Sequence, residues 1–421
     1  CLDDPADLLI AFLAGARAGA LAMVFDASWT APRRAWVEKQ VRPDIIVDAQ
    51  TLDDLRAVKL ELPAVGDPVA SDLFYAGFTS GSTGDPKGYC RSHGSWLGSF
   101  RLSEAEFQIG PNDRIVIPGG LAHSLHLYGA VHGLCAGASV EVVRRFNPKF
   151  LADRLRAASN TVLYATPTQI HYLAEELIRS GGAETVRLVL ASGAKWQPND
   201  RRHLAKVLPD ARLVEFYGAS EMSFITLSVP EEPIPDGSVG RAASGVRIAI
   251  GNPEVRNEPG VTGLIWVKSA LLFDHYICGG GEEIRWKDGW LTVGDRGFVD
   301  DNGYLFLAGR EKRMIVTSGL NVYPEEIERI LEEEDCVRSS AVFGLADPVR
   351  GARLVAAVDS SGDPDQLEAR LRRLCISQLG QAKTPHEFRF VSNWPLTVGG
   401  KTDLKALERM IAGESGCEAA E

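Results

Sequence analysis

Residues 79–88 read Thr79-Ser80-Gly81-Ser82-Thr83-Gly84-Asp85-Pro86-Lys87-Gly88. Glycine permits the backbone torsions and the close approach that a phosphate-wrapping loop needs. Hydroxyl and backbone N–H groups can donate to phosphate oxygens, and Lys87 adds a positive charge. An apolar run at 73–78 precedes the stretch, and a helical pattern at 92–107 follows it. This setting favours a phosphate-binding loop over the alternative, a solvated Gly/Ser linker.

The spacing is not that of a Walker loop, because Pro86 stands where Gly-x-x-x-x-Gly-Lys requires its second glycine. The stretch resembles instead the phosphate-binding signature of the AMP-forming adenylating enzymes. That superfamily includes acyl- and aryl-CoA synthetases, the adenylation domains of peptide synthetases, and luciferases. Further motifs follow in the family's order, so the resemblance covers nearly the whole chain and is closest to the acyl-CoA synthetases.

The resemblance implies a reaction in two halves. A carboxylate attacks the α-phosphate of ATP and gives an acyl-adenylate and pyrophosphate. The thiol of coenzyme A, or of a carrier-protein pantetheine, then displaces AMP. The implied small molecules are therefore ATP, Mg²⁺, coenzyme A and a carboxylic acid.

Composition narrows the class of protein. The 421 residues suffice for two or three domains, and 45% of them are hydrophobic. A net charge of -11 without a basic cluster argues against nucleic-acid binding. The seven cysteines are scattered and odd in number, which disfavours a disulfide framework or a zinc site and makes a reducing cytoplasm the simplest setting. No apolar run reaches transmembrane length.

The chain begins with Cys1 rather than Met. By the resemblance, its first family element, at residues 8–20, belongs well inside an N-terminal domain. We therefore expect an N-terminal piece to be absent, either because the numbered chain is a fragment or because it is a short variant.

Strand and helix patterns alternate along the first two thirds of the chain. Helices are expected at 6–19, 31–41 and 169–180, strands at 115–117, 162–165 and 188–190, and an acidic, irregular connection at 49–70. This alternation predicts an α/β fold with helix-covered mixed sheets, followed by β runs that suggest a small distorted barrel. From Ser339 the order strand, strand, helix, strand predicts a small α+β domain. We expect domains at 1–309 and 310–421, the second of them mobile.

Two further strand ends carry nucleotide-binding candidates. Tyr217-Gly218-Ala219-Ser220-Glu221 matches the family's Tyr-Gly-x-Thr-Glu, with Ser220 in place of Thr. The resemblance implies that Phe216, Tyr217 and Gly218 border the adenine and that Ser220 bonds the α-phosphate. Glu221 would hold Mg²⁺, a hard cation that prefers carboxylate and phosphate oxygens. The small residues Ser192-Gly193-Ala194 are expected to pack on the adenine.

Later motifs extend the resemblance to the ribose and the thiol. Asp295, in a match to Thr-Gly-Asp in which Val293 replaces Thr, would accept the ribose hydroxyls, and Arg310 would contact the ribose. Lys312 is the expected hinge of the C-terminal domain. Gly319 would let the pantetheine arm pass close to the backbone.

The last motif ends at Gly400-Lys401. It resembles the family's catalytic-lysine loop, although Leu396 replaces a basic residue. The resemblance implies that Lys401 bridges the acyl carboxylate, the α-phosphate and a ribose oxygen. Together with Ser220 and Glu221, Lys401 completes the expected catalytic set.

His123 and Phe224 are the candidates for the acyl pocket. In amino-acid-activating relatives this region carries an Asp for the substrate ammonium, but no acidic residue occurs from 114 through 140. A buried amine would have no carboxylate partner here. With Phe216 nearby in sequence, a fatty or aryl acid is expected.

Two alternatives stay open. The thiol could belong to an acyl carrier protein, or the chain could be a non-catalytic nucleotide-binding relative, as the shortened start, Val293 and Leu396 suggest. Retention of five phosphate- or ribose-facing groups favours catalysis. These groups are Lys87, Glu221, Asp295, Arg310 and Lys401.

Overall fold

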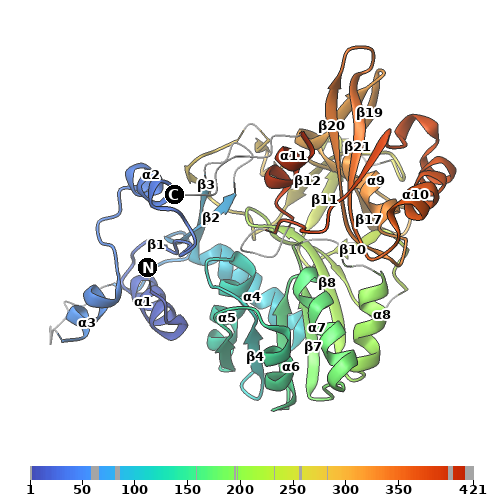
Figure 1. Cartoon of the computed structure of the whole chain (residues 1–421). Helices are drawn as coiled ribbons and strands as arrows, with labels where there is room; N and C mark the ends of the chain where they lie inside the picture. Colours follow the sequence, from blue (N-terminus) through green and yellow to red (C-terminus); the bar gives the residue numbers. More distant parts are fainter. Residues whose placement is uncertain are drawn as a thin grey trace, which may run out of the picture. The chain divides into compact units, whose positions relative to one another are not determined.

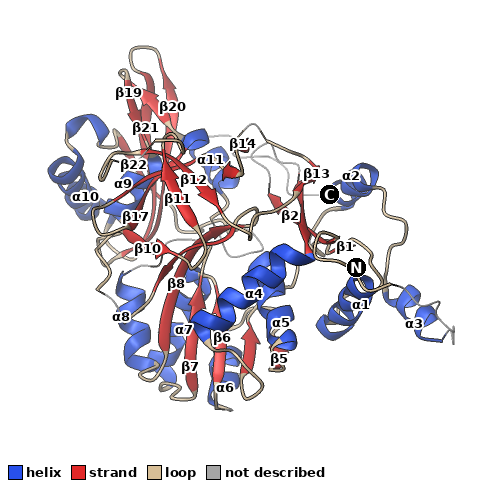
Figure 2. Cartoon of the chain, turned by 180° about the vertical axis from the view of Figure 1, so that it is seen from behind, coloured by secondary structure: helices blue, strands red, loops and turns tan. Residues whose placement is uncertain are grey.

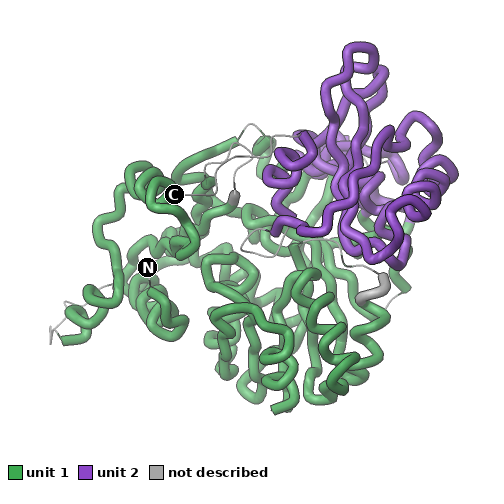
Figure 3. The backbone as a smooth tube through the Cα atoms, viewed as in Figure 1, with its two compact units in different colours: residues 1–249, 266–293, 302–305 green, residues 250–265, 294–301, 306–421 purple. Residues whose placement is uncertain are grey.

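The computed structural model describes residues 2–57, 66–80, 86–157, 159–193, 196, 198–231, 233–255, 258–281, 283–396 and 402–412. The chain forms two compact units, green and purple in Figure 3. Unit 1 comprises residues 1–249, 266–293 and 302–305, and unit 2 comprises residues 250–265, 294–301 and 306–421. The expected domain boundary between residues 309 and 310 stays a prediction.

Unit 1 contains a sheet whose central strands are parallel (Figure 1). In spatial order its strands are β10 (Ser238–Ala242), β9 (Ser223–Ser228), β8 (Arg212–Ala219), β7 (Val186–Ala191), β6 (Thr161–Ala165), β4 (Arg114–Ile117) and β5 (Ser139–Val142). Strands β9 and β10 are the antiparallel members of this set. The expected strands at 115–117, 162–165 and 188–190 are confirmed as β4, β6 and β7.

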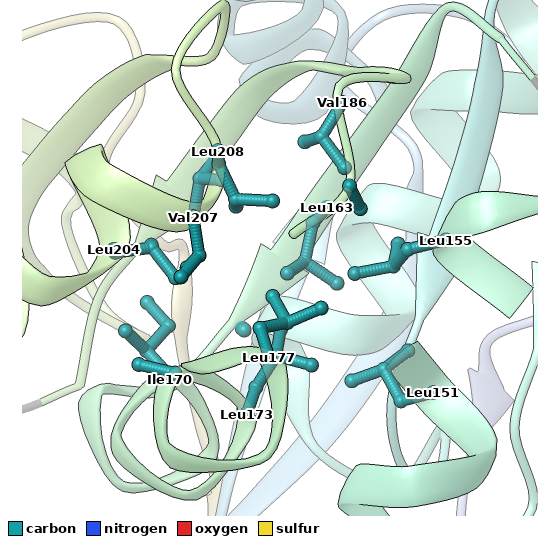
Figure 4. Close-up of a cluster of buried hydrophobic side chains, with 14 of the residues drawn as sticks. Leu151, Leu155, Leu163, Ile170, Leu173, Leu177, Val186, Leu204, Val207 and Leu208 are labelled. Atoms are coloured by element: carbon teal, nitrogen blue, oxygen red, sulfur yellow. The ribbon is translucent and has the colours of Figure 1, made fainter. Parts of the chain in front are cut away.

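Helices cover both faces of this sheet. They are α4 (His93–Phe107), α5 (Ser124–Cys135), α6 (Pro148–Arg156), α7 (Pro167–Ser180) and α8 (Pro198–Val207). Side chains alternate between the two faces of a strand. Leu163 of β6 therefore packs with Leu173 and Leu177 of α7 (Figure 4), while the next residue, Tyr164, contacts Gly129 of α5. Figure 1 shows the face of the sheet that α7 covers, and Figure 2 shows the face that α4 and α5 cover.

A second sheet in unit 1 has the order β1 (Ala22–Met23), β2 (Leu73–Ser80), β3 (Pro86–Ser92) and β13 (His275–Cys278). The sequence prediction missed β3 and led the phosphate stretch directly into a helix. Its seven residues are all buried, but Pro, Lys, Gly and Arg among them hide the strand pattern. The stretch at 79–88 thus connects two antiparallel strands, and α4 begins only after β3.

The N-terminal helices largely follow the sequence patterns. Those expected at 6–19 and 31–41 are confirmed as α1 (Pro5–Arg17) and α2 (Ala31–Val41), but the irregular connection expected at 49–70 is wrong at its start, where α3 (Ala49–Ala57) forms. The Asp48 carboxylate accepts the backbone N–H of Thr51 at 2.8 Å. Such a cap offsets the unpaired N–H groups of a first turn, and the acidic composition concealed it.

Residues 247–310 are rich in strands, as expected. They are β11 (Arg247–Ile250), β12 (Gly263–Lys268), β14 (Arg285–Lys287), β15 (Trp290–Thr292), β16 (Asp295–Val299) and β17 (Tyr304–Arg310). Strands β14 and β15 pair antiparallel, and Gly263 and Leu264 of β12 pair with β16.

The C-terminal part of unit 2 has its own three-stranded sheet, in the order β20 (Val337–Asp347), β21 (Gly351–Ser360), β22 (Glu387–Phe390). Around it lie β18 (Ile315–Thr317), β19 (Leu320–Val322), α9 (Pro324–Leu331), α10 (Pro364–Leu379), α11 (Leu404–Ala412) and the 3₁₀ turns Glu311–Arg313 and Gln381–Lys383. Val342 packs with Ile330 and Leu371 on one face, and Val355 packs with Leu407 on the other. The predicted α+β order is confirmed, as is the mixed α/β class.

No helix in the described part of the chain combines the length and the apolar character needed to cross a bilayer.

Candidate functional site

The two described arms of the predicted phosphate-binding stretch are paired strands. Thr79 is opposite Lys87, and Ser80 is opposite Pro86. Lys87 therefore stands on β3 at the base of the predicted loop, where the sheet fixes its backbone. The predicted loop residues Gly81, Ser82, Thr83 and Gly84 lie outside the described residues.

The Tyr217–Glu221 motif forms the end of β8 and the turn toward β9. The pairing of these strands shifts in register between Tyr217 and Gly218. A Cβ on Gly218 would lie 2.1 Å from the carbonyl oxygen of Ser223, so only glycine fits this close approach. Just beyond it, the Ser220 hydroxyl lies 3.4 Å from that of Ser124. Because Ser124 follows His123, the predicted α-phosphate residue lies beside the start of the predicted acyl-pocket segment.

The predicted adenine contacts lie at the ends of adjacent parallel strands. Ala191 of β7 pairs with Glu215 of β8, so Ser192 and Gly193 leave β7 beside Phe216 and Tyr217. In open α/β sheets, ligands bind outside the carboxyl ends of such strands. The structure therefore brings these four residues to one edge, whereas Ala194 lies outside the described residues.

One carboxylate holds this edge together. Glu215 is 8% exposed and accepts the backbone N–H of Trp196 at 2.9 Å. Its other carboxylate oxygen lies 3.8 Å from the guanidinium of Arg201. The backbone of Trp196 is thereby fastened to β8.

A series of contacts links the predicted metal ligand to the predicted phosphate lysine. The Tyr276 hydroxyl donates to Oε1 of Glu221 at 2.7 Å, and Nζ of Lys87 lies 6.0 Å from the centre of the Tyr276 ring. Lys87 also forms a close ion pair with Glu283. Burial raises the pKa of the Tyr276 hydroxyl, and the adjacent Glu221 carboxylate raises it further. Tyr276 is therefore a neutral donor to Glu221.

The site suits a metal that arrives with its nucleotide. Mg²⁺ is typically held by one or two carboxylates together with substrate phosphates and water. Glu221 supplies one half-buried carboxylate, and the described residues contain no group of three or more His, Cys, Asp or Glu that could hold an ion by themselves. This donor set fits Mg²⁺ bound with ATP, and the metal role of Glu221 stays a prediction.

The two predicted ribose ligands meet within unit 2. Nε of Arg310 donates to Oδ1 of Asp295 at 2.9 Å. The Asp295 side chain is only 7% exposed, whereas that of Arg310 is 65% exposed. The pair presents a guanidinium to solvent and keeps its carboxylate largely covered.

The predicted residues of the second half-reaction lie nearby in the chain. Lys312 is in the 3₁₀ turn that directly follows Arg310. Gly319 connects β18 and β19 with a φ of +78°, and a Cβ there would meet no atom within 4 Å. The space beside Gly319 is therefore open, as passage of a pantetheine arm would require. Lys401 lies outside the described residues.

The predicted acyl-pocket residues are placed differently from each other. His123 precedes α5 and is partly accessible, with its ring centre 5.1 Å from that of His126. Phe224 is 2% exposed, and its ring centre lies 4.6 Å from that of Phe216 and 5.5 Å from that of Tyr128. Phe224 thus belongs to an aromatic core behind the edge, and its contact with an acyl group stays a prediction.

The sequence matches a family described as AMP-binding enzyme over residues 1–277, and the AMP-binding enzyme C-terminal domain over residues 326–401. The chain belongs to the AMP-binding enzyme family. Its relatives include an uncharacterized acyl-CoA ligase, YhfT, of Bacillus subtilis, which is 38% identical over 371 residues, covering 88% of this chain and 74% of that protein. This enzyme is accordingly an acyl-CoA ligase of the AMP-forming kind.

A more distant relative and a solved structure are also similar to this chain, the latter in its fold. VraA of Staphylococcus epidermidis, a candidate long chain fatty acid-CoA ligase, is 27% identical over 417 residues, which are 98% of this chain and 87% of VraA. The fold is that of ATP-bound MatB from Rhodopseudomonas palustris, with a TM-score of 0.86 at 24% identity, over 99% of this chain and 88% of MatB.

Sequence reasoning missed a buried arginine in this ligase. Arg91 of β3 is 3% exposed. Its guanidinium donates to the hydroxyl of Ser95 at 3.1 Å and to the carbonyl oxygens of Ser220 and Leu271 at 3.0 and 2.7 Å. Arg91 therefore fastens the turn that carries Ser220 and Glu221 to the strand that carries Lys87. The sequence gives no signal for this role, because the polar residues of β3 hide its burial.

We predict that Arg91→Met lowers the free energy of unfolding by about 2–4 kcal/mol, because two largely buried carbonyl groups lose their donor. Arg91→Lys should recover only part of this loss, since an ammonium cannot reproduce the guanidinium fork. Chemical denaturation measures both. The exposed Arg101 of α4 supplies the control, Arg101→Met, with an expected change within about 0.5 kcal/mol. Equal midpoints for Arg91→Met and Arg101→Met would contradict the fastening role.

Proposed function

We propose that this ligase activates a carboxylic acid with ATP and Mg²⁺ and then transfers the acyl group to coenzyme A. In the first step a carboxylate oxygen bonds to the α-phosphorus, the bond to the bridging oxygen of the β-phosphate breaks, and pyrophosphate leaves. In the second step the thiol sulfur bonds to the acyl carbon, the bond to the phosphate oxygen breaks, and AMP leaves. The thiol proton passes to solvent.

The observation that carries this proposal is the series of contacts Lys87–Tyr276–Glu221. A lysine on the arm of a glycine- and hydroxyl-rich stretch and a half-buried carboxylate stand on either side of one tyrosine. A cation and a metal-binding carboxylate held this near each other suit a polyphosphate with its magnesium. Phosphoryl transfer needs positioned positive charge more than it needs an acid or a base.

The residues of unit 1 receive the following roles in the proposal. Thr79, Ser80 and Lys87, with the glycine stretch, hold the β- and γ-phosphates. Ser220 donates to an α-phosphate oxygen, and Glu221 binds the Mg²⁺ that accompanies ATP. Bound Mg²⁺ would supply charge neutralisation to the phosphates. The adenine lies against Ser192, Gly193, Phe216, Tyr217 and Gly218.

The roles assigned to the later residues rest on the family resemblance. Asp295 and Arg310 bind the ribose, and their mutual hydrogen bond orients both side chains. Lys401 contacts the acyl carboxylate and the α-phosphate in the first step. A rotation at Lys312, where residues 310–421 act as a mobile domain, then brings Gly319 into use for the thiol. Such hinge gating separates two steps that need different residues.

We propose a fatty or aryl acid as the substrate. The absence of acidic residues from 114 to 140 disfavours an amine-bearing acid, and the rings of Phe216, Phe224 and Tyr128 pack together as an aromatic core behind the edge. Burial lowers the pKa of His126 to about 4, so this neighbour of His123 is neutral near pH 7. The long chain fatty acid in the name of VraA supports the same class.

The test is a screen of pyrophosphate release over short, long and aromatic acids, with ATP, Mg²⁺ and coenzyme A. Products are identified by mass spectrometry. The proposal predicts AMP and an acyl-CoA in equal amounts for at least one apolar acid. Release of ADP would reject the adenylate route, and thioester formation only on an added acyl carrier protein would reject the assignment to coenzyme A.

We predict that Lys401→Ala lowers adenylate formation by about 10²–10³-fold, as loss of one charge-stabilising donor typically does. Transfer from a supplied acyl-adenylate to coenzyme A should continue, because the proposal gives Lys401 no part in that step. Single-turnover measurements of each half-reaction separate the two. An equal loss in both would contradict the division of roles.

We predict that Lys312→Pro impairs thioester formation more than adenylation, because proline fixes φ at the proposed hinge. Lys312→Ala keeps the backbone free and serves as the matched control, with both half-reactions expected near the parent rates. A stronger effect of Lys312→Pro on adenylation would reject the hinge.

A further inference from the structure

The glycine-rich segment after β13 lies along the arm of the phosphate stretch. Tyr276 pairs with Tyr89 and Cys278 with Gly88, so β13 runs antiparallel to β3. At Gly279, φ is +67°, and a Cβ would lie 2.6 Å from the carbonyl oxygen of Pro86. Only glycine allows this approach, and it carries the chain past the Lys87 backbone.

The same segment then brings a carboxylate back onto Lys87. A Cβ on Gly281 would lie 2.1 Å from a carboxylate oxygen of Glu283, so the glycine leaves room for that carboxylate. Glu283 forms the close ion pair with Lys87, although 196 positions separate them in the chain. The two side chains are 14% and 10% exposed, respectively.

Low exposure makes this pair strong and costly to separate. Water screens it little, and removing one partner leaves a charge in a poorly solvated place. The Tyr276 ring, 6.0 Å from Nζ of Lys87, adds a second favourable contact for the ammonium. Any phosphate that binds Lys87 must therefore replace the Glu283 carboxylate or share the ammonium with it.

We infer that Glu283 is a specificity-determining residue, an internal counter-ion that holds Lys87 and yields it only to a polyphosphate. The inference rests on the proposed placement of the β- and γ-phosphates at Lys87. A triphosphate with its magnesium brings enough charge and enough contacts to offset the broken pair. AMP has no phosphate at that position and gains nothing from the exchange, so Glu283 weakens ATP and pyrophosphate binding while leaving AMP binding unchanged.

The test is equilibrium binding, by calorimetry on the full chain, of ATP with Mg²⁺, pyrophosphate with Mg²⁺, and AMP. Glu283→Gln keeps the shape of the side chain and removes its charge. We expect about tenfold tighter binding of ATP and pyrophosphate, the change that 1.4 kcal/mol of released competition produces, and AMP affinity within twofold of the parent. Weaker or unchanged ATP binding would overturn the inference, as would an equal gain for AMP.

Two further variants isolate the mechanism. In a Lys87→Met background, Glu283→Gln should give a clearly smaller gain in ATP affinity than in the parent, because competition for the ammonium is gone and only repulsion of the phosphates remains. A gain as large as in the parent would show that general electrostatic repulsion accounts for the effect and would overturn the inference. Glu141→Gln is the matched control, because it removes the carboxylate of another largely buried ion pair. The side chains of that pair, Glu141 and Arg114, are 23% and 13% exposed, respectively. This variant should leave all three affinities unchanged, and a matching gain there would also overturn the inference.

The two proposals fail in different ways. If the parent enzyme releases pyrophosphate with an apolar acid but Glu283→Gln changes no affinity, the counter-ion role is wrong and the activity stands. If no acid supports pyrophosphate release while the affinities shift as expected, Glu283 controls a polyphosphate site and the proposed reaction is wrong.

Discussion

Antiparallel pairing of β13 with β3 is the constraint on which the candidate site depends. The two strands lie far apart in the sequence, and their pairing places Tyr276 opposite Tyr89. From that register Tyr276 reaches Glu221, and the glycines that follow return Glu283 to Lys87. Together with the bond that Arg91 donates to the turn carrying Glu221, this pairing connects the predicted phosphate lysine with the predicted metal ligand.

A second constraint comes from charge. The chain carries a net charge of -11, so an anionic nucleotide needs cations gathered where it binds. Strand β3 carries two cationic side chains, Lys87 and Arg91, and both are buried. They are held in different ways, because Lys87 pairs with a carboxylate whereas Arg91 donates to carbonyl groups and a hydroxyl. In the proposal Lys87 exchanges its partner for a phosphate, whereas the bonds of Arg91 hold backbone segments in place.

The parts of the fold that repeat a simple pattern could be predicted from the sequence. Burial can be predicted from apolar runs such as Leu188–Leu190 and from the helical spacing of apolar residues at 169–180. The order of the motifs identified the family. Strand β3 could not be predicted in this way, since Lys87 and Arg91 are buried through specific partners rather than through apolar character. The pairing of Lys87 with Glu283 could not be predicted from the sequence either, because it depends on the register of two strands and joins residues 196 positions apart. Helix α3 was missed because its cap at Asp48 lies in an acidic stretch that resembles a linker.

We propose acyl-adenylate formation beside Lys87, Glu221 and the ends of β7 and β8. Its most direct measurement is the exchange of labelled pyrophosphate into ATP in the absence of coenzyme A. We expect exchange that requires both Mg²⁺ and an apolar carboxylic acid, and that is lost in Lys87→Met. Exchange that requires coenzyme A, or that proceeds equally well without any acid, would contradict it.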